Sequence, residues 1–294
     1  MEQHLALHAV LIPSLIAAVA CALSRFIPFL RRITPVLVPL GLAAVAVRAG
    51  VVQEGISILT TWPPATRWIT AIACIVAMGC GGALLGLIAI PENGRGTLGA
   101  ALLAGSIAGG VVLGVLAIPG ESTTWIVART AVAAGVLSMI LSTGKVRGPG
   151  IFLSFAFPTA ALAGLLLVSG SAKLAVTAGS VAFACGMLGL LAIPLRITLG
   201  AGGVAVLSVT LTTLAAQGRG YDYDSFPTWI WAIVALSPLA GMLADLAPAR
   251  LLPDLVRFAL RAGPPLAISA GGLLLAAWKA GMFATGKSND PYGP

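Results

Sequence analysis

About ten apolar runs, each long enough to cross a lipid bilayer as a helix, fill nearly all of this 294-residue sequence. A membrane-spanning helix needs roughly 20 mainly apolar residues. The runs that meet this length cover residues 5–24, 33–52, 67–90, 97–118, 123–141, 151–169, 174–193, 197–216, 228–246 and 263–283. Only short breaks containing Gly, Pro or Arg separate them, so neighbouring helices are expected to run antiparallel.

The composition excludes the other fold classes. Only 9 % of the residues are charged and 59 % are hydrophobic, whereas a soluble domain carries about 25 % charged residues. Disorder requires low hydrophobicity, and a transmembrane barrel requires shorter, alternating strands. We therefore predict an all-α, polytopic transmembrane helix bundle of about ten spans, in the range of eight to ten. It forms one integral membrane domain, residues 1–294, with a short polar tail at 284–294.

One phrase recurs along the chain. The heptapeptide LGLIAIP at 85–91 returns as LGLLAIP at 188–194, and LGVLAIP at 113–119 resembles both. Many transporters are built from repeated halves, so one interpretation is an internal duplication. The other is chance repetition among a few apolar residue types.

Glycines inside the runs predict close helix packing. Gly82 and Gly86 are four residues apart, as are Gly105 and Gly109, so each pair shares one helix face. Small residues at this spacing let helix backbones approach each other in a membrane. Prolines also lie inside the runs and should kink their helices, because proline lacks a backbone N–H: Pro13, Pro35, Pro39, Pro158 and Pro238. These features suit a moving transporter and a rigid bundle equally.

The basic residues predict the orientation. With ten spans, ten of the 17 Lys and Arg fall in the odd-numbered connections, including the clusters Arg25/Arg31/Arg32 and Arg250/Arg257/Arg261. Cytoplasmic connections carry an excess of Lys and Arg. We therefore expect both termini outside the cytoplasm, in a bacterial inner (plasma) membrane.

Two connections differ in composition from the rest. Tyr221, Asp222, Tyr223 and Asp224 form an acidic and aromatic loop, which is either anchored at the membrane interface or exposed as a contact for a partner or a cation. The segment 253–263 begins with Pro and Asp and ends with Gly, which predicts a short amphipathic helix at the interface or a short elbow against the bundle.

Polar groups inside the runs are the candidates for a substrate path. Thr210, Thr212 and Thr213 form the most polar patch in any run, and Arg48 and Asp245 are the deepest charged residues. Intramembrane charge indicates transport by default. Threonine hydroxyls also bond to their own helix backbone, which is the simpler interpretation of the patch.

Other functional classes find no support in the sequence. The basic residues are scattered rather than gathered into a face, which argues against nucleic-acid binding. The segment 281–288 matches a P-loop in letters, but it lacks the preceding strand and following helix that nucleotide binding needs. Two histidines and four buried-type cysteines without CxxC spacing form no metal or cofactor site. A membrane enzyme that acts on lipid would need paired carboxylates or a cluster containing histidine, and the sequence offers neither.

Two functions remain. The first is a small-molecule permease, and the alternative is a non-catalytic membrane subunit of a larger complex. The expected partners are membrane lipids and either a membrane protein or a second copy of the chain.

Overall fold

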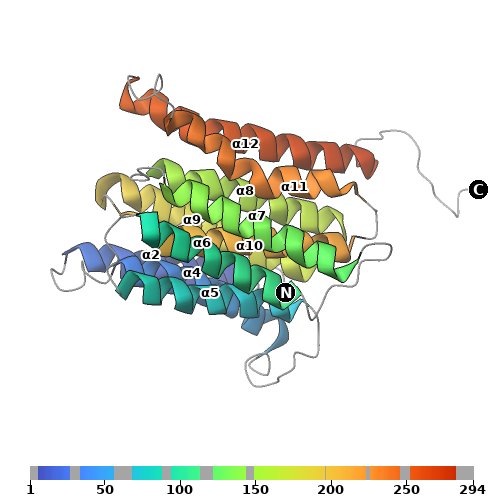
Figure 1. Ribbon diagram of the computed structural model, residues 1–294, viewed down its shortest axis with the longest axis horizontal. Helices are drawn as coiled ribbons and strands as arrows, with labels where there is room; N and C mark the ends of the chain where they lie inside the picture. The colour runs from blue at the N-terminus through green and yellow to red at the C-terminus, as the bar shows by residue number, and fades with distance from the viewer. Residues whose placement is uncertain are drawn as a thin grey trace, which may run out of the picture.

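The computed structural model describes residues 6–26, 34–55, 68–87, 94–112, 122–143, 149–195, 197–222, 226–245 and 252–282. In this part of the chain every regular element is a helix, and the axes run roughly side by side (Figure 1). The elements are η1 (Ala6–Leu11), α2 (Ile12–Phe26), α4 (Thr34–Glu54), α5 (Ile69–Leu87), α6 (Gly94–Val112), α7 (Thr123–Thr143), α8 (Pro149–Val168), α9 (Ala172–Leu195), α10 (Gly200–Gly220), α11 (Thr228–Leu236), η3 (Ser237–Asp245) and α12 (Asp254–Lys279). The predicted all-α polytopic membrane bundle is confirmed.

Seven of the described helical segments are long and apolar enough to cross a membrane, and three shorter apolar segments, 7–23, 69–85 and 98–109, complete the set. Each segment coincides with one of the apolar runs. Large apolar side chains on the outside of the bundle, such as Leu102 (64 % exposed) and Leu255 (78 % exposed), have lipid as their natural surroundings. The chain is therefore a multi-pass membrane protein.

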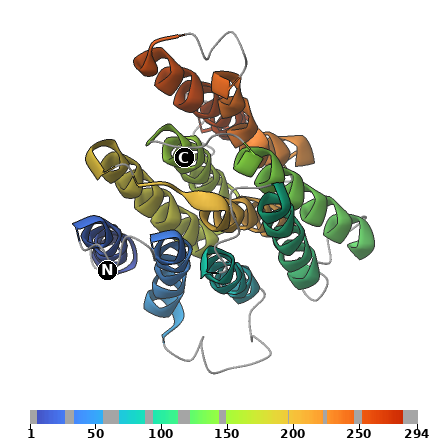
Figure 2. The same cartoon turned by 60° about the vertical axis from the view of Figure 1, so that its left-hand side comes forward.

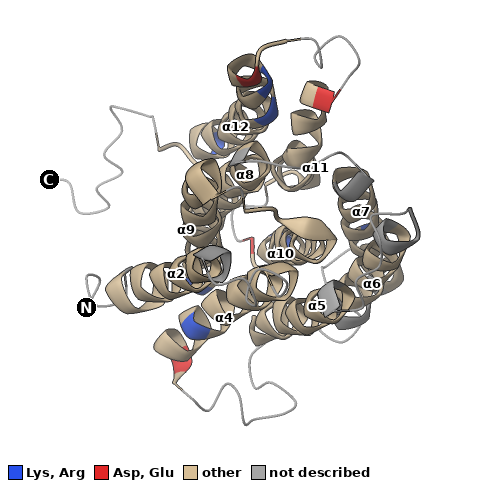
Figure 3. Cartoon of the chain, turned by 90° about the vertical axis from the view of Figure 1, so that its left-hand side faces the viewer, with Lys and Arg blue, Asp and Glu red and all other residues tan. Residues whose placement is uncertain are grey.

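α10 lies at the centre of the bundle. It packs against α4, α5, α6, α7, α8, α9 and α11, and Figure 3 shows it enclosed by other helices. In the most apolar 18-residue stretch of α10, 83 % of the residues are buried inside the bundle, compared with 22 % in the corresponding stretch of α12. The α11–α12 pair lies on one side of the bundle, over α8 (Figures 1 and 2).

Glycines set the closest approach of α10 to its neighbours. A Cβ atom on Gly202 of α10 would lie 2.5 Å from the carbonyl oxygen of Gly82 on α5. The predicted seam of Gly105 and Gly109 is also confirmed, because a Cβ on either glycine would meet Ala131 of α7 within 3.1 Å. At both places backbone packs against backbone, which supplies the van der Waals contact that holds helices together in lipid.

Connections between helices are tight where the structure describes them. Gly170, between α8 and α9, has a φ of 86°, a conformation that glycine adopts without strain. Its turn lets the backbone N–H of Ser171 donate to the carbonyl oxygen of Leu166 at 2.7 Å, which satisfies one of the open carbonyls at the end of α8. Such short connections place the ends of α8 and α9 side by side.

The prolines of the last two crossings have different effects on their helices. The ninth crossing changes from α-helix to 3₁₀-helix at Ser237, next to Pro238, one of the five prolines expected to kink their helices. Pro39 and Pro158 lie inside α4 and α8, and each of these continues as an α-helix through its proline. The prediction that a short helix ends at Gly263 is wrong. α12 runs without a break from Asp254 to Lys279, through Pro264 and Pro265, because packing against α8 and η3 holds the helix together across its prolines.

The duplication stays a prediction. Residues 88–91 of the first repeated phrase and the whole phrase at 113–119 lie outside the described residues. The two ends of the bundle are named here by one residue each. The Asp245 end carries the end of η3 and the start of α12, and the Asp222 end carries the end of α10 and the start of α11.

Candidate functional site

The candidate site lies at the Asp245 end, where four helices meet. The carboxylate of Asp245, the last residue of η3, forms an ion pair with the guanidinium of Arg261 on α12. Their side chains are only 22 % and 16 % exposed. A small cavity lies beside the pair and is lined by Ile140, Leu141, Ile151, Ser154, Gly241, Met242, Asp245 and Arg261. We call these eight residues the Asp245 site.

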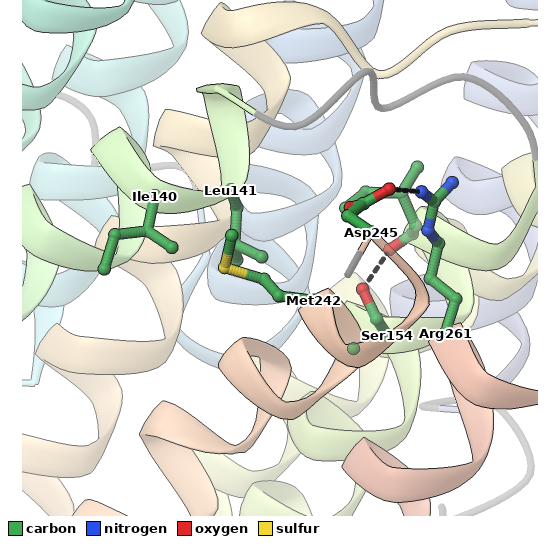
Figure 4. A pocket seen from close by; sticks show the side chains of 8 residues that line it. Ile140, Leu141, Ser154, Met242, Asp245 and Arg261 are labelled. Atoms are coloured by element: carbon green, nitrogen blue, oxygen red, sulfur yellow. Dashed lines mark hydrogen bonds and ion pairs between the residues drawn. The ribbon is translucent and has the colours of Figure 1, made fainter. Parts of the chain in front are cut away.

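Polar and apolar groups occupy opposite sides of the Asp245 site. Figure 4 shows Asp245, Arg261 and Ser154 together, with Met242, Leu141 and Ile140 facing them. The hydroxyl of Ser154 donates to the carbonyl oxygen of Ile151 at 2.8 Å. The cavity measures about 10 Å³, which is close to the minimum that holds one water molecule. The site is closed in this conformation.

Both helices that carry the ion pair have interrupted backbone hydrogen bonding. Pro265 has no N–H to donate to the carbonyl oxygen of Arg261, its partner four residues earlier. Gly241 of η3 lies against this oxygen, since a Cβ on Gly241 would be 2.7 Å from it. The absence of a side chain at Gly241 therefore lets the two irregular helices touch.

In the ninth crossing, a side chain replaces the backbone hydrogen bond that Pro238 cannot make. In an α-helix residue 238 would donate to the carbonyl oxygen of Val234, and Pro238 cannot. The hydroxyl of Ser237 donates to that oxygen instead, at 2.9 Å. From this point the chain continues as nine residues of 3₁₀-helix. Stretches of more than three or four residues are uncommon and often mark a hinge.

The threonines of the predicted substrate path lie inside α10. Each hydroxyl donates to its own helix: Thr210 to the carbonyl oxygen of Val206 at 2.8 Å, Thr212 to Ser208 at 2.8 Å and Thr213 to Val209 at 2.6 Å. All three residues are at most 4 % exposed. They do not line the Asp245 site. The structure thus joins Asp245 to Ser154 and Arg261, but not to the threonines.

Arg48, the remaining residue of the predicted path, lies elsewhere. It is exposed on α4 and lines an open groove between α4 and α5 on the outside of the bundle. The groove contains no residue of α10 or of the Asp245 site.

The described part of the predicted partner loop folds inward. The Asp222 carboxylate, 0 % exposed, accepts hydrogen bonds from the backbone N–H of Phe226 at 2.7 Å and from Nε1 of Trp231 at 3.3 Å. Arg219 lies 3.9 Å from the same carboxylate. Tyr221 is half-buried against the core. The loop positions the start of α11, while Tyr223 and Asp224 lie outside the described residues.

Two residues of these polar networks are not among the site residues predicted from the sequence, Gln217 and Arg261. Gln217 of α10 is 3 % exposed and donates through Nε2 to the hydroxyl of Thr70 on α5 at 2.7 Å. Its spacing of four residues from Thr213 places it on the same helix face, a signal that the sequence contains. Arg261 carries no comparable signal, since its partner Asp245 belongs to another helix.

No metal-binding cluster is present within the described ranges, where no three His, Cys, Asp or Glu side chains come together. The four cysteines are free, and Cys80 is exposed while the other three are buried.

Comparisons with known proteins do not assign the chain to a family. No family model matches the chain, and neither a curated protein nor a solved structure matches it. The functional argument therefore rests on the geometry of the bundle.

Proposed function

We propose that this membrane protein is a permease for small, neutral solutes that form hydrogen bonds. The observation that carries the proposal is the meeting of η3, a 3₁₀ segment, with α12, a continuous helix that lacks the backbone donors of Pro264 and Pro265, at the ion pair of Asp245 and Arg261. Transporters commonly build their substrate sites from discontinuous helices. Irregular backbone inside a membrane is tolerated where it is buried in protein or lines a water-filled cavity.

The ion pair serves as a gate in this proposal. While Asp245 and Arg261 are paired, the cavity beside them has room for about one water molecule. Movement of η3 away from α12 separates the pair and widens the space between α7 and α8. α10 packs against both of these helices, so the widened space leads toward its hydroxyl groups.

The polar residues of α10 indicate the class of solute. Between residues 204 and 217 they are hydroxyl and amide side chains: Ser208, Thr210, Thr212, Thr213 and Gln217. A hydroxyl that donates to its own helix still has oxygen lone pairs with which to accept a hydrogen bond. This stretch contains no ionisable side chain, which favours a neutral solute moving down its gradient over proton-coupled transport.

Flux through reconstituted vesicles tests the proposal. Protein in liposomes is mixed rapidly with hyperosmotic glycerol or urea, and the recovery of vesicle volume is followed by light scattering. We expect faster recovery than in protein-free liposomes, and a further increase in Asp245→Asn, which weakens the gate. If neither solute enters faster through wild type or Asp245→Asn, the proposal fails for this class.

A cysteine in the proposed path gives a test that needs no substrate. Thr213→Cys is placed in a Cys80→Ser background, because the other three cysteines are buried. A water-soluble cationic thiosulfonate should label it slowly, and faster when Asp245→Asn is added. Equal rates with and without that change would contradict the gate.

The alternative, a non-catalytic membrane subunit, is favoured by one specific observation. The threonines of α10 are packed into the core and line neither of the two cavities described here. A subunit that only holds a complex together needs such a solid centre. Extraction in a mild detergent separates the two functions, since a subunit should bring down a partner in fixed stoichiometry.

A further inference from the structure

An outward-facing groove runs between α4 and α5. Its volume is about 400 Å³, within the range of roughly 300–1,000 Å³ typical of small-molecule sites. The lining residues are Leu40, Ala43, Ala44, Val47, Arg48 and Val51 from α4, and Val76 and Cys80 from α5. The groove is therefore apolar except for one cation and one thiol.

Within the described ranges, Arg48 has neither an acidic partner nor any other hydrogen bond or ion pair. Four other basic residues of the described chain have carboxylate partners: Lys173 pairs with Glu54, Arg219 with Asp222, Arg257 with Asp254 and Arg261 with Asp245. Lys279, at the end of α12, has no carboxylate partner among the described residues, but it does not line the groove. A guanidinium on the lipid side of a membrane helix is costly unless it reaches the interface or meets an anion. An anion in the groove would be attracted to this charge at the interface.

The depth of Arg48 matches the level of a lipid headgroup. It lies six residues before Glu54, the end of α4, so its Cα is about 9 Å from that end at 1.5 Å per residue. A long arginine side chain can extend its charged head toward the interface from this depth. Leu40, at the other limit of the groove, lies eight residues earlier, about 12 Å deeper.

We propose that the groove between α4 and α5 binds an anionic phospholipid, with the phosphate group on Arg48 and one acyl chain lying along the apolar lining toward Leu40 and Cys80. The guanidinium of Arg48 lies at the depth of a lipid phosphate, and the apolar channel lies deeper, at the depth of an acyl chain. A zwitterionic lipid carries a compensating positive charge, which reduces its attraction to Arg48. The site does not depend on the proposed permease function, because it lies on the outside of the bundle.

Lipid retention measured by native mass spectrometry tests the charge. Protein is incorporated into nanodiscs containing equal amounts of phosphatidylglycerol and phosphatidylcholine, and the lipids that stay bound after release are identified. Wild type should retain phosphatidylglycerol in preference to phosphatidylcholine. Arg48→Gln should reduce that preference roughly fivefold, the upper range for one part-exposed ion pair, and Arg48→Lys should keep part of it.

A matched variant separates the groove from general electrostatics. Lys279→Gln removes one positive charge from the end of α12, at the same end of the bundle but away from the groove. It should leave the retention unchanged. Equal losses in Arg48→Gln and Lys279→Gln, or equal retention of the two lipids by wild type, would overturn the proposal.

Filling the groove tests its shape without touching the charge. Cys80→Phe places a ring in the channel and should reduce retention although Arg48 is intact. Leu84→Phe, one helical turn further along α5 and 58 % exposed, adds the same bulk outside the groove and should change nothing. A disulfide between the Cys80 residues of two copies in lipid would assign the groove to a second copy of the chain and would also overturn the proposal.

Discussion

Gln217 of α10 and Thr70 of α5, 147 residues apart in the chain, are joined by a buried side-chain hydrogen bond of 2.7 Å. It links the central helix to the third crossing close to the Asp222 end. Polar contacts of this kind between membrane helices average about 0.6 kcal/mol and reach about 2 kcal/mol. The bond is therefore a modest but specific connection between distant parts of the sequence.

The first prediction concerns this bond. Gln217→Leu should lower the free energy of unfolding by about 1 kcal/mol, because it removes the donor to Thr70 while keeping an apolar side chain. Unfolding in mixed micelles with increasing dodecyl sulfate measures the change. In the double variant with Thr70→Val, the two effects should not add, since each single change already breaks the bond. Additive losses would show that the two side chains are not coupled.

The second prediction concerns the contact of α5 with α10. Gly202→Ala should destabilise the bundle by at least roughly 1–3 kcal/mol, the usual result of overpacking, because its Cβ would lie 2.5 Å from the backbone oxygen of Gly82. Thermal aggregation of the purified protein measures the loss. Gly186→Ala on α9 is the matched control, since a Cβ there meets nothing within 4 Å. A tolerated Gly202→Ala would contradict the packing described here.

The third prediction concerns the ion pair of the Asp245 site. Arg261→Gln should lower stability by roughly 1–3 kcal/mol, between the values for exposed and buried pairs, because it removes the guanidinium that pairs with the part-buried Asp245 carboxylate. The exchanged pair, Asp245→Arg with Arg261→Asp, should recover part of the loss. Thermal unfolding of the three proteins measures this. Arg257→Gln is the control, since its pair with Asp254 is largely exposed.

The fourth prediction concerns orientation in a bacterial inner membrane, which we propose from the distribution of Lys and Arg. Alkaline phosphatase fused after residue 294 should be active, because the Asp222 end is expected outside the cytoplasm. A fusion in the connection after α2, which contains Arg31 and Arg32, should be inactive and should fluoresce when green fluorescent protein replaces the phosphatase. The reverse pattern would invert the proposed topology.

The fifth prediction concerns thiol reactivity. Of the four cysteines, Cys80 alone is exposed, whereas Cys21, Cys74 and Cys185 are at most 1 % exposed. A membrane-permeant maleimide should therefore modify one thiol per native chain in detergent and four after denaturation. Mass spectrometry counts the adducts. Cys80→Ser should remove the native adduct entirely, and modification of a second native thiol would show that the core opens.

The positions of the helices follow from local sequence properties, so they could be predicted. Length and hydropathy decide whether a segment enters lipid as a helix, and backbone hydrogen bonding then stays within the segment. The break at Pro238 is local in the same way, because it depends on a missing N–H. The glycine seam of Gly105 and Gly109 required only the helical period.

The site depends on contacts between helices, which no local pattern specifies. Asp245 and Arg261 lie on different helices, and their meeting requires the path of the chain between η3 and α12. The helix end predicted at Gly263 is wrong, because Gly and Pro there disfavour a helix only locally, whereas contacts with other helices also act on this segment. In the folded protein α8 and η3 pack against α12 and offset the lost hydrogen bonds of its prolines.

The threonines of α10 could be predicted only in part from the sequence. Their hydrogen bonds to their own helix follow from residue type, but their central location does not. Among the seven long described crossings, α10 shares the lowest mean hydropathy, 1.3, with α12, yet α10 is the more buried of the two. Polarity in a membrane helix is more easily accommodated inside protein than in lipid, so the inward placement of α10 has a physical reason even though the sequence alone left it open.

The central location of α10 also constrains how the protein is made. A ribosome delivers the chain from its amino terminus, so seven crossings enter the bilayer before the helix that most of them surround has been synthesised. Until residue 220 emerges, the surfaces of α4, α5, α6 and α7 that finally contact α10 can meet only lipid, one another or an insertion chaperone. Assembly of the first half of the molecule is therefore completed by the second half, late in translation.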